Sequence, residues 1–516
     1  MTSMLDTQPS LFAGAEWNYD TLRRAYDAIE AIAKGEFGLD TYANQIEVIT
    51  AEQMLDAYSS IGLPLMYKHW SFGKHFARDE TLYRKGLRGL AYEIVINSNP
   101  CISYVMEENS MAMQTLVMAH AAFGHNHFFK SNSLFRQWTD ADGILDYMDF
   151  AKTYIARCEE RHGHEAVERV LDAAHAIMDH GVHRYPRKRK LNLRQEEQRE
   201  RERAEHQERI YNDLWRTVPK ASAAAASRDE IAERKKLLRL PEENLLYFIE
   251  KTGPKLQTWQ REILRIVRNL AQYFYPQKQT KVMNEGCATY VHYAIMQRLH
   301  ETGGLTDGAM LEMLHAHTSV IAQPDFDDQR FSSLNPYALG FGMMGDIARI
   351  ATAPTEEDRA WFPAFAGNGD PWGTLRGIWA DYRDESFILQ FLSPHLMRKM
   401  KLFAIRNDPS DSDVVVTAIH DEQGYRDVRK TLAQCYDIAA IEPDIQIVDV
   451  DLAGDRHLVL HHRVLDGAIL EAGDARRVLQ HIANVWGYPV LLLEVDAATD
   501  ATIKEHEPVE PSHSLG

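Results

Sequence analysis

The 516-residue sequence is poor in cysteine and has no long apolar run, and both shortages narrow the kind of protein it encodes. Its four cysteines are far apart and form no C-x-x-C pair, which is typical of a reducing compartment and not of a disulfide-stapled secreted protein. No stretch approaches the roughly 18 apolar residues of a membrane span. The N-terminus has no basic segment followed by an apolar one, so no signal peptide is expected. We therefore expect a cytoplasmic protein without a membrane span.

The sequence also has fewer basic than acidic residues. The chain has 57 Lys and Arg against 75 Asp and Glu, a formal net charge of −18. Non-specific nucleic-acid binding needs a basic surface, so no nucleic-acid partner is expected. The sequence also lacks a P-loop, a G-x-G-x-x-G fingerprint and a G-x-S-x-G elbow, so neither a nucleotide site nor a serine-hydrolase nucleophile is predicted.

The periodicity of apolar residues predicts a mainly α-helical body followed by a small α+β domain. Apolar residues return every three or four positions over most of 1–395, with one short strand expected within 92–107. Residues 186–240 have dense mixed charge and few apolar residues, which predicts a charged, flexible insertion. From 398 to 497 five alternating apolar segments and two helical ones predict the α+β domain. The polar tail, 498–516, is expected to be disordered.

Histidines gather in "AHAAFGH", residues 119–125, which makes this segment the first candidate site. On a regular α-helix, His120 and His125 point about 140° apart, so they could bind one ion only if the helix ends or bulges near Gly124. The zinc motif H-E-x-x-H is absent, because the spacing is wrong and Ala121 stands where its glutamate would be. A histidine on an apolar helix is more often an ordinary core residue, and that alternative stays open.

Two further groups could complete such a site. His175 lies in a second A-H-A-x-x-x-H pattern, which predicts it as a metal ligand, whereas His180 and His183 fit the favourable charge of a helix C-terminus. Glu107 and Glu108 precede the 119–125 segment, where they could act as acid/base carboxylates or merely cap a helix.

The segment "NEGCA", residues 284–288, resembles the helix from which gluzincin metallopeptidases take a glutamate zinc ligand. In that role Glu285 would bind the ion, with His292 on the same side one layer away. The match is short, and a buried glutamate paired with an arginine is the competing interpretation. We expect 119–125 to face 284–288, with Gly124 and Gly286 allowing close backbone approach. His120, His125, His175 and Glu285 would then converge on a zinc or iron ion.

Several segments together resemble the stage V sporulation protein R (SpoVR) family. They include "YEIVINSNPCISYVMEEN", "QTLVMAHAAFGHNHFFKSN", "KVMNEGCATYVHY", "NPYALGFGMMGDI" and "DYRDESFILQFLSP", in order along nearly the whole chain. The resemblance implies a link to spore cortex formation or, outside spore formers, to stationary-phase and stress physiology. It also implies association with a serine kinase and a von Willebrand-like protein. The family tends to have a small residue where this chain has His127, which argues against His127 as a ligand.

The resemblance implies no established biochemical activity, so two hypotheses remain. The first is a regulatory or scaffold factor whose α+β domain docks partners. The second is a metal-dependent hydrolase, distantly metallopeptidase-like, that acts on a peptide or amide bond. In the hydrolase, His120, His125 and Glu285 would hold the ion, and Glu107 or Glu108 would be the base.

Overall fold

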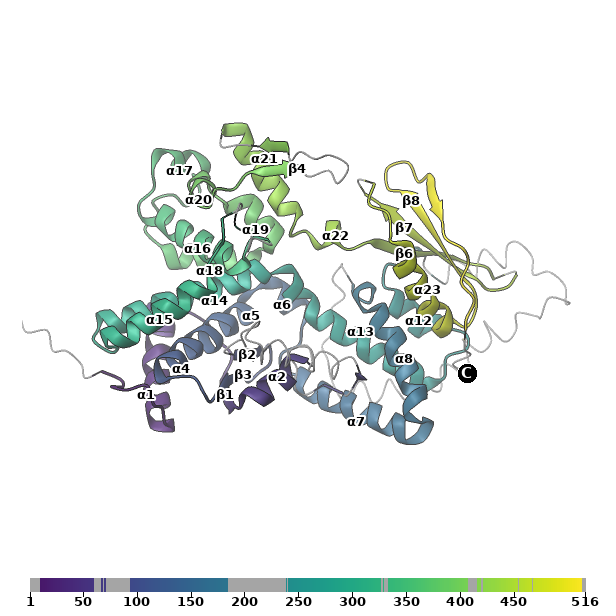
Figure 1. Ribbon diagram of the computed structural model, residues 1–516, viewed down its shortest axis with the longest axis horizontal. Helices are drawn as coiled ribbons and strands as arrows, with labels where there is room; N and C mark the ends of the chain where they lie inside the picture. Colours follow the sequence, from purple (N-terminus) through teal and green to yellow (C-terminus); the bar gives the residue numbers. More distant parts are fainter. Residues whose placement is uncertain are drawn as a thin grey trace, which may run out of the picture. The chain divides into compact units, whose positions relative to one another are not determined.

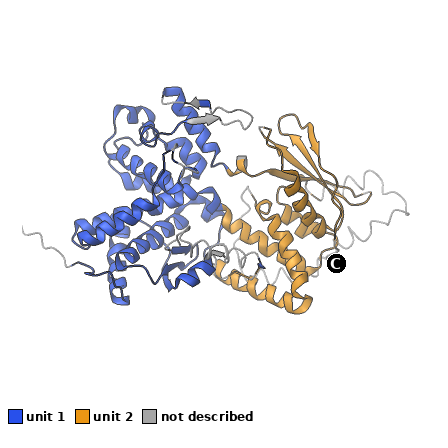
Figure 2. Ribbon diagram, in the orientation of Figure 1, with its two compact units in different colours: residues 1–64, 70–142, 276–437 blue, residues 65–69, 143–275, 438–516 orange. Residues whose placement is uncertain are grey.

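The computed structural model describes residues 10–59, 66–67, 69–70, 93–183, 238, 240–325, 328, 333–406, 415–418, 421–452, 454–465 and 467–512. Almost all of the predicted insertion at 186–240 lies outside these residues. The chain divides into two compact units (Figure 2). Unit 1 comprises 1–64, 70–142 and 276–437, and unit 2 comprises 65–69, 143–275 and 438–516.

Unit 1 is a mainly helical unit with small sheets (Figure 1). Its helices are α1 (Tyr19–Glu30), η1 (Ala31–Glu36), α2 (Ala51–Ser59), α4 (Met111–Met118), η2 (Ala119–His125), α5 (Asn126–Ser131), α6 (Ser133–Trp138), α14 (Lys281–Glu301), α15 (Asp307–Val320), α16 (Pro336–Thr352), α17 (Glu356–Trp361), α18 (Pro371–Asp381), α19 (Asp384–Phe391), α20 (Pro394–Lys399) and α21 (Glu422–Gln434). Its strands are β1 (Asn44–Ile49), β2 (Glu93–Ile96), β3 (Cys101–Met106), β4 (Ala404–Arg406) and β5 (Val415–Ala418).

Helix α14 runs through the core of unit 1, and many of its own side chains are apolar or small and buried. Buried side chains such as Val282, Cys287 and Val291 occur on its successive turns. Its N-terminus is capped from outside the helix, since Asp384 accepts hydrogen bonds from the backbone N–H groups of Val282 and Met283, at 2.8 and 2.9 Å. This cap satisfies two donors that a helix end leaves unpaired.

A three-stranded sheet with order β1-β3-β2 lies beside these helices. β1 pairs parallel with β3, and β2 pairs antiparallel with β3. The single strand predicted within 92–107 is therefore a pair of strands joined by the turn at Asn99 and Pro100. β1 was not predicted, because "NQIEVI" is short and only partly buried.

Unit 2 combines helices with a four-stranded sheet. Its helices are α7 (Ile144–His162), α8 (His164–Ala176), η3 (Met178–His180), α12 (Leu245–Thr252), α22 (Ile438–Ile441) and α23 (Ala472–Trp486), together with most of α13 (Thr258–Gln279). Its strands are β6 (Asp444–Val450), β7 (Leu458–Val464), β8 (Val490–Asp496) and β9 (Thr502–Glu505), in that order across the sheet. β7 and β8 are parallel, and α23 connects them.

The mainly helical body and the C-terminal α+β region are confirmed, with two differences of detail. β4 and β5 form a separate two-stranded sheet within unit 1, so the four-stranded sheet begins only at β6. The expectation of a disordered tail is wrong for residues 502–512, because β9 extends the sheet and Val509 exchanges two 3.0 Å backbone hydrogen bonds with Val490. Nε2–H of buried His506 donates a hydrogen bond of 2.7 Å to the carboxylate of Glu494, an anchor that the polar sequence of the tail did not reveal.

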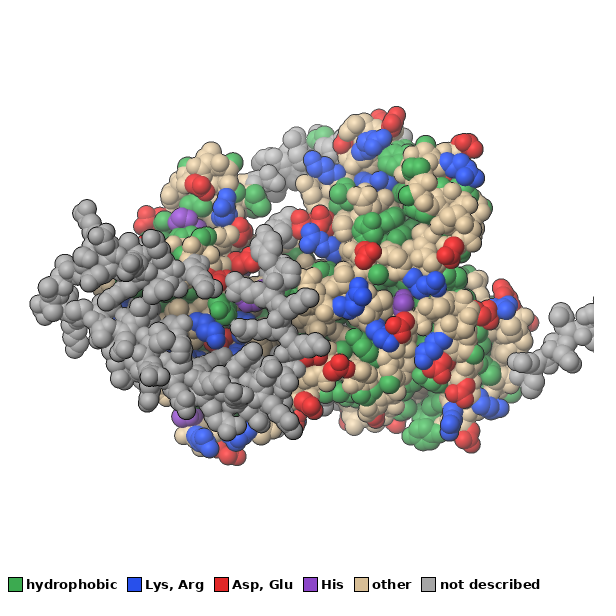
Figure 3. Space-filling view, turned by 180° about the vertical axis from the view of Figure 1, so that it is seen from behind, with side chains coloured by type: hydrophobic (Ala, Val, Ile, Leu, Met, Phe, Trp, Pro, Cys, Tyr) green, Lys and Arg blue, Asp and Glu red, His purple; other side chains and the backbone are tan. Residues whose placement is uncertain are grey.

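None of the described helices is both long and apolar enough to cross a bilayer. On the face that Figure 3 presents, basic and acidic side chains are interspersed. This visible part of the described surface carries no continuous basic patch of the kind that tracks a nucleic-acid backbone.

Candidate metal centre

The segment 119–125 forms a π-helix, η2, inserted between α4 and α5. In a π-helix the backbone hydrogen bonds run i→i+5, so side chains five positions apart come to nearly the same face. His120 and His125 therefore lie together, with ring centroids 4.6 Å apart, instead of diverging as on a regular helix. This is the bulge that binding of one ion by both histidines would require.

Glycine allows this π-helix to pack directly on α14. A Cβ atom at Gly124 would lie 2.5 Å from Ala288 Cα, closer than real Cβ contacts occur. The prediction that 119–125 faces 284–288 is thus confirmed. Gly286 has a different role, because its missing side chain lets α14 approach Gly340 of α16.

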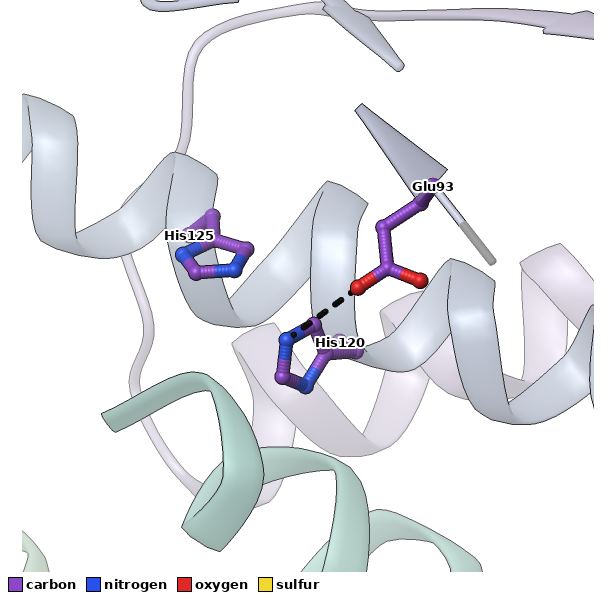
Figure 4. A group of neighbouring side chains, drawn as sticks. All are labelled: Glu93, His120 and His125. Carbon is purple, nitrogen blue, oxygen red and sulfur yellow. Dashed lines mark ion pairs between the residues drawn. The ribbon is translucent and has the colours of Figure 1, made fainter. Parts of the chain in front are cut away.

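A carboxylate from the sheet joins the two histidines (Figure 4). Glu93, the first residue of β2, places Oε1 3.4 Å from Nε2 of His120. One ligand-type atom from each of Glu93, His120 and His125 lies within 4.8 Å of the others, and all three side chains are largely buried. The structure thus brings two imidazoles and a carboxylate from two elements to one point.

Glu285 brings a second carboxylate to the same group. Its Oε2 lies 3.6 Å from Nε2 of His125, and this buried oxygen accepts no hydrogen bond from the described residues. The amide oxygen of the neighbouring Asn284 accepts a hydrogen bond from Nδ1–H of His125 at 2.9 Å. That bond puts the ring proton on Nδ1 and leaves the Nε2 lone pair of His125 directed towards Glu285.

These separations suit an ion better than direct hydrogen bonds. Zinc bonds of about 2.0–2.1 Å in a tetrahedron place neighbouring ligand atoms about 3.3–3.4 Å apart. The His120–Glu93 and His125–Glu285 distances, 3.4 and 3.6 Å, are close to that value and longer than a good hydrogen bond. The donor set of histidines and carboxylates is one that zinc or iron accepts.

No described lysine or arginine forms an ion pair with the carboxylates of Glu93 and Glu285. Burial and the nearby charge of Glu285 raise the pKa of Glu93 to about 8. Burial, with the charges of His125 and His292, lowers the pKa of His120 well below its usual range. The competing interpretation of Glu285, a buried ion pair with arginine, has no support in the described residues, whose ion pair with Glu285 is that of His125. A bound dication would supply the missing positive charge.

Two more histidines extend the group through the core. Nδ1 of His120 lies 2.9 Å from Nδ1 of His292, and Nε2 of His292 lies 3.0 Å from Nδ1 of His317. His292 was expected one layer from Glu285, and the structure places it in direct contact with the candidate ligand His120.

The other predicted site residues lie elsewhere. His175 belongs to unit 2, where its Nε2 is 2.6 Å from the hydroxyl of Tyr67 and its ring stacks on His69 at 4.7 Å. Glu107 and Glu108 are exposed in the turn after β3, and Glu108 accepts a hydrogen bond from the N–H of Ala51 at the start of α2. These contacts fit the capping alternative for Glu108 and give none of the three a place in the cluster.

The cluster does not line the described pocket of unit 1. A pocket of about 1250 Å³ is lined by residues of α16, α20 and α21 and of the loop before α16, and none of the cluster residues lines it.

Comparisons with known proteins agree with the segments described above. A profile described as "SpoVR like protein" matches residues 16–441, and one described as "SpoVR-like C-terminal domain" matches 443–497. The chain is 51% identical over 490 residues, 95% of either chain, to a protein of Escherichia coli (strain K12) named "Uncharacterized protein YcgB". No solved structure matches the chain.

Proposed function

The chain belongs to the SpoVR family, and we propose that it is a metal-dependent hydrolase whose ion is held by Glu93, His120 and His125, with the carboxylate of Glu285 beside them. The observation that supports this proposal most directly is the convergence of two carboxylates and two histidine Nε2 atoms in a buried site without a described basic partner. Buried carboxylates are costly unless they are paired or bind a cation.

The proposed roles follow from the contacts. His120, His125 and Glu93 form the tighter group and would hold the ion. Glu285, whose Oε2 accepts no hydrogen bond from described residues, would be the general base that takes a proton from the attacking water. A bound zinc or iron ion would supply Lewis acidity and lower the pKa of that water. The substrate class that fits this chemistry is a peptide or amide bond.

The test separates ion binding from turnover. Purified protein should bind zinc or iron at close to one ion per chain. Glu93→Gln should weaken zinc binding at least tenfold, whereas Glu285→Gln should keep most of it and lose hydrolysis of a peptide library. Glu107→Gln and His175→Ala are matched controls from outside the cluster and should leave binding unchanged. A wild-type chain that binds no ion would refute the proposal and leave the cluster as a structural polar network.

The second candidate is a regulatory factor, which the separate C-terminal module favours. Residues 443–497 match a family profile of their own and correspond to the sheet β6–β8 with α23. We propose that this module docks a partner, a serine kinase or a von Willebrand-like protein, in the cytoplasm during cortex formation or stationary-phase stress. Deletion of residues 443–516 should then abolish copurification of the partner while the ion site in unit 1 keeps its zinc. Retention of the partner by the truncated chain would contradict this role.

A further inference from the structure

Three histidines from three helices form a continuous chain that begins at the ion site. His120 of η2 contacts His292 of α14, and His292 contacts His317 of α15, through ring nitrogens 2.9 and 3.0 Å apart. All three side chains are buried, with exposed fractions of 5, 3 and 3%. Both contacts have hydrogen-bond length, so each must have a donor on one ring and an acceptor on the other.

Counting protons leaves two arrangements for this chain. A neutral imidazole has one N–H donor and one acceptor nitrogen, and burial disfavours the charged form that would have two donors. In the outward arrangement, Nδ1–H of His120 donates to His292, and Nε2–H of His292 donates to His317. In the inward arrangement both bonds reverse, and Nε2 of His120 carries the proton. The rings must change together, because one reversed bond would set two donors or two acceptors against each other.

We propose that His292 and His317 are positioning residues that hold His120 in the tautomer that binds the ion, an inference that rests on the proposed function. A metal binds the lone pair of a neutral imidazole nitrogen, so an ion at Nε2 of His120 requires its proton on Nδ1. Only the outward arrangement allows this.

The two candidate histidine ligands are therefore held in different ways. The amide oxygen of Asn284 can only accept, so it fixes the tautomer of His125 on its own. The partner of His120 is the imidazole of His292, which can either accept or donate a hydrogen bond. Which of the two it does depends on its own hydrogen bond with His317. His317 ends this chain packed between the rings of Tyr293 and Phe341, which hold its orientation.

The first measurement reads the tautomers directly. The full-length chain, labelled with ¹⁵N in its histidine rings, is saturated with zinc, and long-range ¹H–¹⁵N correlations assign the protonated nitrogen of each ring. Single His→Gln variants identify the signals. We expect His292 and His317 both to carry their proton on Nε2, although neither ring contacts the ion. A proton on Nδ1 of His292 in the zinc-bound protein would overturn the inference.

The second measurement is zinc affinity. Partners of a ligating histidine typically contribute 10–100-fold to metal affinity, so His292→Phe should weaken zinc binding by that factor. His317→Phe should weaken it by a smaller factor, and His317→Asn should restore it to within threefold, because the asparagine oxygen can accept in place of Nδ1. His315→Phe is the matched control, since His315 is exposed on the same helix.

The outcomes separate the inference from the proposed function. If the wild-type chain binds zinc while His292→Phe and His317→Phe bind it equally well, the proposed ion site stands and the positioning role is refuted. If the wild-type chain binds no zinc, the proposed function fails and the inference fails with it. A loss of zinc by His317→Phe that the Asn variant does not restore would indicate a packing effect and would also refute the positioning role.

Discussion

Replacing Gly124 with alanine should separate the π-helix from α14 and remove the ion site. The added Cβ would lie 2.5, 2.9 and 3.2 Å from Cα, Cβ and O of Ala288. Two of these atoms belong to the backbone of a core helix, so neither can rotate away. Overpacking of this kind costs typically about 1–3 kcal/mol, and backbone contact places this site near the upper end. We expect unit 1 to lose about 3 kcal/mol, which corresponds to a fall in melting temperature of roughly 5 °C for a unit of about 300 residues.

A matched control exists in the other π-helix. Gly35 lies in η1, and a Cβ there would meet no atom within 4 Å. Gly35→Ala should therefore be neutral or stabilise the protein by up to about 1 kcal/mol, because alanine restricts the unfolded chain. The double variant Gly124→Ala/Ala288→Gly should recover less than half of the loss, since it relieves only the Cβ contact. Thermal unfolding and zinc titration of the variants are the assays. Equal melting temperatures for Gly124→Ala and Gly35→Ala would refute the reasoning.

Three further predictions concern other contacts. Burial would raise the pKa of Asp358, but hydrogen bonds from Arg349 and Thr355 outweigh it and lower the pKa to about 2. The ordinary value is 3.8, so the carboxylate contributes about 2 kcal/mol above pH 4, which is lost as the pH falls towards 2. In urea, Asp358→Asn should therefore be less stable than wild type at pH 7 and equal to it near pH 2; a constant difference would contradict this. Glu494→Gln should weaken the buried contact between Glu494 and His506 and so increase amide hydrogen exchange in β9. Unchanged exchange in β9 would show that this contact does not anchor the strand. Asn284→Ala should weaken zinc binding about 10–100-fold without unfolding the chain, and unchanged affinity would remove its assigned role.

Residue spacing within short segments predicted those features of the site that depend on the backbone of one segment. The five-residue spacing of His120 and His125, with Gly124 between them, required a helix defect, and the π-helix is that defect. The small residues of 284–288 likewise indicated close helix packing. Both inferences depend on backbone geometry over a few residues, which a single sequence contains.

The remainder depended on tertiary placement, which the sequence pattern does not contain. Glu93 opens a short strand, and its place in an alternating segment is that of any outward-facing polar residue. Only the hairpin pairing of β2 with β3, and the packing of β2 against η2, turn it towards His120. His175 shows the opposite error, because its A-H-A-x-x-x-H pattern repeats that of His120 while the residue belongs to unit 2.

The cluster in unit 1 combines features that each reduce stability unless a ligand compensates for them. A π-helix is rarer than an α-helix and occurs frequently at functional sites. Glu93 and Glu285 add two largely buried carboxylates, and burial, together with the nearby charge of Glu285, raises the pKa of Glu93. Such an arrangement persists in a core when function requires it, since an apolar substitution at these positions would relieve both costs. A divalent ion relieves them as well, because it stabilises the carboxylates and gives the aligned histidine lone pairs a partner. A bound ion would therefore account both for the bulge of the helix at Gly124 and for the meeting of two acidic side chains where no described basic residue reaches.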